Sequence, residues 1–212
     1  MAPAEKVRAM NDLVSAIYEI HNAKVARNLR RNRFSIAPPR IAICGPGRSG
    51  KDVAANTIAR VMGVPYLRST SQAAIDLVWK KWGCHQMNYH ESARGDDIHT
   101  IKYASKEAMF ADRSAHRETW ARIIWKYNEP DGVRLYREMI ESGEFILCGI
   151  RRPEELRACQ VAGLVDLTIW IDRPGCEDAT CEIQSDDCDL SVPNWGTEEQ
   201  FVAKLTRLAS VL

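Results

Sequence analysis

The sequence predicts an α/β fold with a mainly parallel sheet. Short apolar runs of the kind found in strands buried on both faces lie at 40–44, 144–149 and 164–171, and a short fourth strand is expected at 190–193. Segments with helical spacing of apolar residues alternate with these runs, and a glycine-rich turn joins the first strand to its helix. Strands that alternate with helices are typical of parallel sheets covered by helices.

Local signals place the ends of several helices. A helix is expected over 52–62 after the glycine-rich turn, and another begins where Asp131 is the expected N-cap. Pro153 begins the next helix, at a position where a missing N–H costs nothing. Thr197 and Gln200 are spaced as a capping box at the start of the last helix.

The first 39 residues are set apart from the rest of the chain. Residues 5–33 have the apolar spacing of a helix whose second half is basic, and Pro38 and Pro39 then end the segment as a linker. We therefore divide the chain into a basic N-terminal helix with its linker, 1–39, and a domain over 40–212. The basic half is either a DNA-binding surface or a solvated or homodimer-forming helix face.

Length, composition and charge exclude several classes of protein. The 212 residues carry 29 Lys and Arg against 28 Asp and Glu, a formal net charge of +1, which argues against a uniformly basic nucleic-acid binder. No apolar stretch approaches the roughly 20 residues of a membrane span, and no signal peptide is evident. We expect a cytoplasmic protein with reduced thiols and no membrane partner. The charge is uneven, because cations but no carboxylates occur between Ile20 and Lys51.

The segment from Gly45 to Asp52, Gly-Pro-Gly-Arg-Ser-Gly-Lys-Asp, is the strongest functional signal. It fits the phosphate-binding pattern Gly-x-x-x-x-Gly-Lys, with Asp where Ser or Thr usually follows. Glycines let successive backbone N–H groups turn toward phosphate oxygens, and the helix N-terminus adds positive potential. A plain glycine turn beside a surface lysine is the alternative. The residues expected to bind the nucleotide are Gly45, Gly47, Arg48, Ser49, Gly50, Lys51, Asp52 and Val53.

The region 66–143 holds the candidate acceptor-side residues. Three cationic or titratable side chains and one aromatic side chain are spaced to lie close to one helix face: Arg113, His116, Arg117 and Trp120. Such a face would clamp an anionic acceptor, with Trp120 or Tyr127 stacking on a base. The alternative is a solvated charged helix with Trp120 in the core.

Arg151 follows a strand at its carboxyl end, where ligands bind in open α/β sheets. A structural salt bridge with Glu154 or Glu155 is the alternative interpretation. Asp172 ends another strand and either approaches the donor base or caps the next turn. The strand before Arg151 has no acidic residue at its end, so Mg²⁺ would rest on Asp52, the phosphates and water. Phosphoryl transfer also needs cations, and the candidates for that role are Lys51, Arg48, Arg117 and Arg151.

The loop Arg48-Ser-Gly-Lys-Asp52 resembles that of the bacteriophage deoxynucleoside monophosphate kinases and the related animal phosphomevalonate kinases. In both, Arg or Lys precedes Ser-Gly-Lys-Asp. The segment 148–155, Cys-Gly-Ile-Arg-Arg-Pro-Glu-Glu, resembles their strand that ends in Arg-x-Pro-Asn-Glu, and segments near 167–174 and 194–197 resemble their last strands and closing helix. The resemblance covers roughly 40–65 and 144–212, and 66–143 matches only loosely.

The resemblance implies a P-loop nucleoside-kinase-like three-layer fold, with 66–143 as a helical acceptor and lid region. It implies transfer of the γ-phosphoryl group of ATP, with Mg²⁺, to a nucleotide, in first place a deoxynucleoside monophosphate. If a phage encodes the protein, the cytoplasm is that of the host cell. Two alternatives stay open: a kinase of the hydroxymethyl group of a modified pyrimidine in phage DNA, and a non-catalytic nucleotide-dependent DNA-binding or packaging protein.

Overall fold

The computed structural model describes residues 38–83, 89–90, 98–99 and 103–212, which contain a parallel four-stranded sheet. The expected N-terminal basic helix lies outside the described residues. The strands, in their order across the sheet, are β4 (Ile146–Cys148), β1 (Ile41–Cys44), β5 (Leu167–Asp172) and β6 (Leu190–Pro193). The predicted α/β class and parallel sheet are therefore confirmed.

The strand β1 lies between two partners and is fully buried. Ile41 pairs with Ile146 of β4 on one side and with Leu167 of β5 on the other. β4 is shorter than the predicted run because Gly149 has a φ of 111°, which leaves the extended conformation. Since all four strands run the same way, their carboxyl ends meet at one edge of the sheet.

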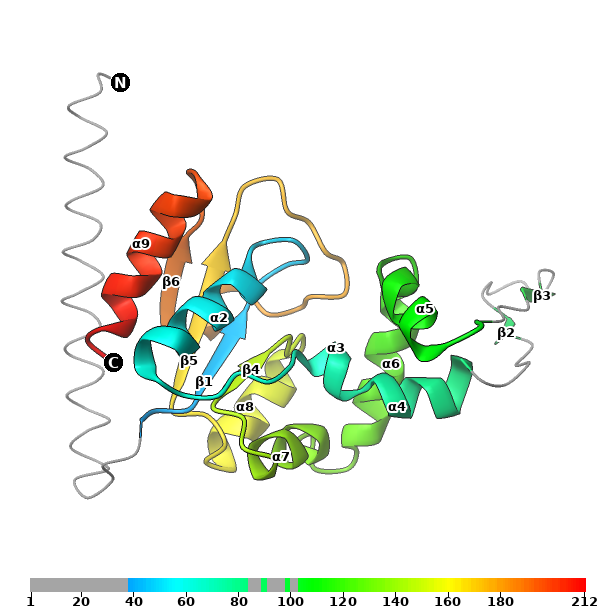
Figure 1. Cartoon of the computed structure of the whole chain (residues 1–212). Coiled ribbons are helices and arrows are strands. Elements are labelled where there is room, and N and C mark those ends of the chain that lie inside the picture. Colours follow the sequence, from blue (N-terminus) through cyan, green and yellow to red (C-terminus); the bar gives the residue numbers. More distant parts are fainter. Residues whose placement is uncertain (1–37, 84–88, 91–97, 100–102) are drawn as a thin grey trace.

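Helices lie on both faces of the sheet (Figure 1). On one face, α2 (Lys51–Met62) and α9 (Glu198–Ala209) pack against each other and against Ile41 and Ile43. The other face carries Ala42 and Cys44, and helices α6 (Arg117–Asn128), α7 (Arg134–Glu141) and α8 (Pro153–Val161) contribute to its core. Alternate residues of one strand thus supply two cores, as the period of a strand requires.

The described part of 66–143 is mainly helical, as predicted. It begins with α3 (Thr70–Ala73), α4 (Ile75–Val78) and a π-helical turn, Trp79–Gly83. A short antiparallel pair, β2 (Tyr89–His90) with β3 (Ile98–His99), was not expected. It continues with α5 (Lys106–Ala111) and a 3₁₀ turn, Asp112–Ser114. Among the described residues, no helix is both long and apolar enough to cross a membrane.

Two predicted helix starts are confirmed and one is wrong. Pro153 stands in the first turn of α8, and Thr197 forms the expected capping box with Gln200. The N-cap of α7 is Val133 rather than Asp131. The Asp131 carboxylate instead accepts a hydrogen bond from the Val133 N–H at 3.1 Å, so it orders the turn before the helix.

Phe201 of α9 provides a test of the packing between α2 and α9. Its side chain is 2% exposed in the core on that face of the sheet. Phe201→Ala is expected to lower the free energy of unfolding by about 3–5 kcal/mol, because it leaves a cavity that the rigid sheet cannot fill. Val161→Ala, at a side chain that is 90% exposed, should change it by less than about 0.5 kcal/mol. Urea titration followed by circular dichroism measures both, and equal losses would contradict this packing.

Candidate active site

The glycine loop between β1 and α2 lies at the carboxyl end of the sheet and is held tightly. Gly45 has a φ of 143°, and a Cβ there would come within 2.8 Å of the Ile171 carbonyl oxygen. Gly50 has a φ of 99°, and a Cβ there would meet Asn194 Nδ2 at 2.6 Å. The same Asn194 amide donates to the Ser49 carbonyl at 2.8 Å. Both glycines are therefore needed, one for the turn beside β5 and one for the approach of Asn194.

The middle of the loop is open to two polar neighbours. A Cβ at Gly47 would lie 2.3 Å from Arg117 Nη1, so a larger residue here would force this arginine to move. The Gly47 N–H donates to Asp178 Oδ2 at 2.9 Å. Arg48 has a φ of 65°, which non-glycine residues seldom adopt, and its side chain is exposed. The loop thus presents both a backbone donor and cations.

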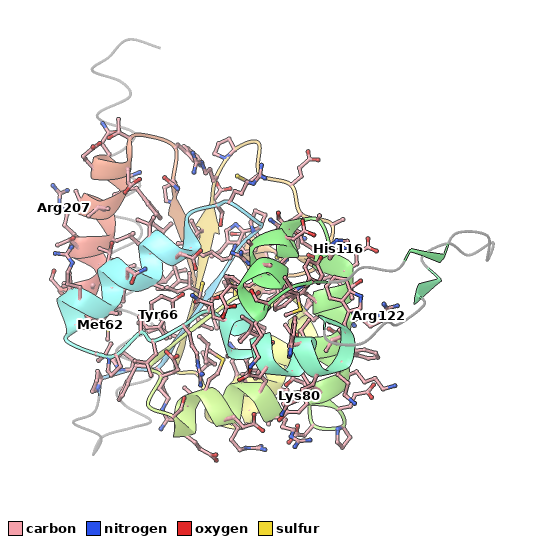
Figure 2. The ribbon with its side chains drawn as sticks, turned by 45° about the vertical axis from the view of Figure 1, so that its right-hand side comes forward. Met62, Tyr66, Lys80, His116, Arg122 and Arg207 are labelled. Atoms are coloured by element: carbon pink, nitrogen blue, oxygen red, sulfur yellow. The ribbon has the colours of Figure 1, made fainter. Side chains whose placement is uncertain are left out.

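Lys51 and Asp52 begin the helix α2. The Lys51 ammonium donates to the Pro46 carbonyl within the loop, and burial together with the charge of Arg151 lowers the pKa of Lys51. The carboxylate of Asp52 accepts a hydrogen bond from Tyr66, on the segment after α2 (Figure 2), at 3.3 Å. Asp52 is exposed toward the cavity described next, so its remaining oxygen is accessible to a ligand.

A cavity of about 380 Å³, here called the inner cavity, extends from the glycine loop between α6 and the carboxyl end of β4. Its size is that of a small-molecule site. Trp120, Ile124 and Tyr136 give it an aromatic and apolar wall. Six cationic side chains line it: Arg48, Lys51, Arg113, Arg117, Arg151 and Arg152. A cavity with this lining suits a ligand that has both a flat ring and phosphate groups.

The end of the inner cavity near α7 and α8 is closed by a buried carboxyl group. Glu155 is 5% exposed, and its two oxygens accept hydrogen bonds from Asn128 at 2.8 Å and from Tyr136 at 3.2 Å. Burial raises the pKa of Glu155, and the hydrogen bonds from Asn128 and Tyr136 oppose this shift. Sequence reasoning did not find this cluster, because Tyr136 fits equally well as part of the apolar face of α7.

A second cavity of about 600 Å³, the outer cavity, lies on the other side of Arg117. Its walls are Gly47 and Arg48 of the loop, the residues from 114 to 119, and those from 175 to 180. The segment 173–184, between β5 and the 3₁₀ turn Ser185–Asp187, crosses above the carboxyl ends of the strands, beside the glycine loop (Figure 1). The glycine loop therefore contributes to both cavities.

Asp178 lies between the two cavities and is the centre of the polar contacts. Its Oδ2 accepts hydrogen bonds from the Gly47 N–H at 2.9 Å, from Arg117 Nη1 at 2.9 Å and from Arg151 Nη1 at 2.8 Å. Its Oδ1 accepts from the Thr180 hydroxyl at 2.6 Å and the Thr180 N–H at 3.2 Å. Burial raises the pKa of Asp178, but the hydrogen bonds and the two arginine charges outweigh it and hold this pKa well below its usual range.

Arg151 lies at the carboxyl end of β4, as the sequence predicts, but its ion-pair partner is one that the sequence did not predict. The alternative of a salt bridge with Glu154 or Glu155 is wrong, because the guanidinium turns toward Asp178 and Thr180 across the site. Asp172 neither caps the next turn nor lines either cavity, since its carboxylate accepts from the indole N–H of Trp195 at 3.1 Å.

The predicted acceptor-side residues are only partly brought together. The expected single helix is broken, because the 3₁₀ turn ends at Ser114 and α6 begins at Arg117. Arg113, Arg117 and Trp120 line the inner cavity. His116 (Figure 2) lines the outer cavity instead, with Nε2 3.2 Å from an Asp112 oxygen and its ring against Trp82.

Tyr127 lies away from both cavities. Its hydroxyl donates to Glu138 at 2.8 Å, and the Arg134 guanidinium stacks 4.3 Å from its ring centre. Of the two aromatic residues expected to stack on a base, only Trp120 therefore lines a cavity. Trp82 belongs to the core on the α6 face of the sheet, and Trp79 packs against that core.

Magnesium fits this site through Asp52. The described residues contain no group of three or more His, Cys, Asp or Glu side chains arranged to hold a metal ion. Asp52 is a single exposed carboxylate at the start of α2, so it would supply one or two oxygen ligands and leave the rest to phosphates and water. Mg²⁺ is commonly bound in this way at nucleotide sites.

Asp178→Asn tests the electrostatics at this position. The loss of the charge should lower the free energy of unfolding near pH 7 by about 1–2 kcal/mol, a modest cost because both arginines are partly exposed and solvent screens them. The low pKa in the folded state stabilises the protein above the unfolded pKa, near 4, and this contribution is lost as the pH falls through the folded value. The difference between wild type and variant in urea titrations should therefore be full above about pH 5 and shrink below about pH 4. A difference in the free energy of unfolding that grows as the pH falls would contradict the stabilising role of the Asp178 charge.

No protein-family model matches the sequence of the chain, and no curated protein matches it either.

Proposed function

We propose that the protein is an ATP-dependent phosphotransferase with a P-loop-kinase-like fold, which transfers the γ-phosphoryl group to a nucleotide, in first place a deoxynucleoside monophosphate. One observation carries the proposal: a glycine loop of phosphate-binding sequence opens at the carboxyl edge of a parallel sheet, between two cavities that share the cations Arg48 and Arg117. Ligands of open α/β sheets bind at this edge.

The two cavities suggest separate places for donor and acceptor. The outer cavity, bounded by the loop and the segment 175–180, would take the phosphates of ATP. The inner cavity would take the acceptor nucleotide, with its base against Trp120 and its phosphate near Arg113 and Arg152. Arg117 lines both cavities, and Lys51 and Arg151 line the inner cavity, so these three cations would flank the transferring group. They would neutralise the charge on the transferring group, which is the main demand of phosphoryl transfer.

In this reaction a phosphate oxygen of the acceptor attacks the γ-phosphorus, and the bond from that phosphorus to the oxygen bridging the β- and γ-phosphates breaks, which releases ADP. Lys51 and Arg117 would stabilise the charge that builds up on the bridging and terminal oxygens. Mg²⁺, held through Asp52, would supply further neutralisation of the β- and γ-phosphates.

The inner cavity favours a monophosphate acceptor over a hydroxymethyl acceptor, because both of its carboxylates already have other roles. A phosphate oxygen is already ionised at neutral pH, so its attack needs no general base, whereas a hydroxyl must lose a proton. The acidic residues that line the inner cavity are Asp52 and Glu155. Both oxygens of Glu155 already accept hydrogen bonds from Asn128 and Tyr136, and Asp52 is the proposed metal ligand.

The decisive experiment offers several acceptors to the protein together with γ-labelled ATP and Mg²⁺. These are the four deoxynucleoside monophosphates, hydroxymethyl-deoxyuridine monophosphate, and duplex DNA that contains hydroxymethyluracil. Label on a free monophosphate supports the proposal, and label on the DNA alone would move the assignment to the DNA-base kinase. ATP binding without label in any acceptor would overturn the kinase and favour the nucleotide-dependent switch protein.

Lys51→Ala is expected to lower kcat for this transfer by at least about 100-fold, because a cation that stabilises transition-state charge contributes several kcal/mol. The matched control is Lys81→Ala, since Lys81 is exposed and lines neither cavity. Its kcat should stay within about twofold of wild type. Equal activities of the two variants would contradict the role of Lys51.

Arg113→Ala tests the assignment of the inner cavity to the acceptor. Loss of a charged hydrogen bond to the acceptor phosphate should raise the KM for the monophosphate by about 10–100-fold. The KM for ATP should change little, because Arg113 lines the inner cavity only. Lys126→Ala, at an exposed position of α6 that lines neither cavity, is the control. Steady-state kinetics with each substrate varied in turn measures both constants, and a larger effect on ATP would reverse the assignment.

A further inference from the structure

The side chain of Asp178 is buried although its neighbours in the chain are exposed. It is 2% exposed, whereas Pro174, Gly175, Glu177 and Ala179 are exposed. The segment is attached at its two ends: the Glu182 N–H donates to the Arg151 carbonyl at 2.8 Å, and Arg173 donates to the Arg48 carbonyl at 3.3 Å. Between these attachments Asp178 alone directs a carboxylate into the glycine loop.

The groups that hold Asp178 are those that a phosphate would need. Gly47 offers a backbone N–H of the glycine loop, and Arg117 and Arg151 offer guanidinium nitrogens, all within 2.9 Å of Oδ2. A phosphate oxygen accepts the same charge-assisted hydrogen bonds as a carboxylate oxygen. A carboxylate oxygen and a phosphate oxygen cannot occupy this position at the same time. Any phosphate that binds the Gly47 N–H and these two arginines must therefore replace Asp178.

We propose that the Asp178 carboxylate occupies, in the nucleotide-free protein, the position of a phosphate oxygen of the donor, and that a bound polyphosphate displaces it together with residues 174–180, which lie between the two attachments. This inference rests on the proposed function, because it takes the glycine loop to be the donor site. Asp178 is then a competing internal ligand of the phosphate site.

A different role for Asp178 would be a permanent support that orients Arg117 and Arg151 toward the substrate. The two roles predict opposite effects of its removal. A support that is lost weakens anion binding, because the arginines separate. An internal competitor that is lost strengthens it, because the apparent dissociation constant equals the intrinsic constant divided by the fraction of open molecules.

Calorimetric titration with inorganic pyrophosphate separates the two roles without any need for catalysis. If the carboxylate fills the site in about nine molecules of ten, Asp178→Ala should tighten pyrophosphate binding by about 10-fold. Asp186→Ala removes an exposed carboxylate that lines neither cavity and serves as the matched control, with a change of about twofold or less. Unchanged or weaker binding in the Asp178 variant, or no binding of pyrophosphate to either protein, would overturn the proposal.

A measurement on the wild-type protein covers the case in which Asp178→Ala does not fold. The Thr180 N–H donates to the Asp178 carboxylate, so displacement of this carboxylate should speed hydrogen exchange in peptides that span 173–184. Unchanged or slower exchange with pyrophosphate bound would overturn the proposal. Failure of the kinase proposal is distinguishable, because it appears as absent label transfer while pyrophosphate still binds and still releases the segment.

Discussion

The structure around the glycine loop depends on one interaction, the placement of a single carboxylate against two arginines and a backbone N–H. Arg117 comes from α6 and Arg151 from the end of β4, so two elements far apart in sequence place positive charge at the same point. Like charges so close repel each other unless an anion lies between them. Asp178 supplies this anion, and its low pKa reflects the strength of the interaction. The fold is stabilised by the same positive charge that a phosphate would use.

This arrangement connects stability with ligand binding. A phosphate carries more negative charge than a carboxylate and offers more acceptor oxygens, so it competes well for the same three donors. A bound phosphate would accept the hydrogen bonds that Asp178 loses, and the released segment around Asp178 would gain conformational entropy. A protein that keeps a cationic site empty without such a group would lose stability through charge repulsion. The low exposure of Asp178 and its short contacts are therefore compatible with a group that later leaves.

The parts of the fold and site that follow from local sequence could be predicted, and the parts that depend on tertiary contacts could not. The strands, the glycine loop and the capping box of Thr197 depend on neighbouring residues, and Arg151 follows from its place after a strand. Asp178 has no such signal beyond a turn with Thr180, because its partners are 131, 61 and 27 residues away. His116 was placed by helical spacing, and the break before α6 changed where it lies. Tyr127 was expected to stack on a base, but its contact with Glu138 holds it elsewhere.

Displacement of Asp178 would also change how the two cavities relate. The inner and outer cavities share Gly47, Arg48, Ser114 and Arg117, and the contact between Asp178 and Arg117 lies where they meet. If the donor phosphates replace the carboxylate, the terminal phosphate faces the inner cavity, in which Arg113 and Trp120 would hold the acceptor. Transfer between two phosphates requires the attacking oxygen, the phosphorus and the leaving oxygen to lie roughly in line. A donor that displaces Asp178 would open this in-line path only when the donor is bound. An acceptor would then have limited access to the glycine loop while no donor is bound.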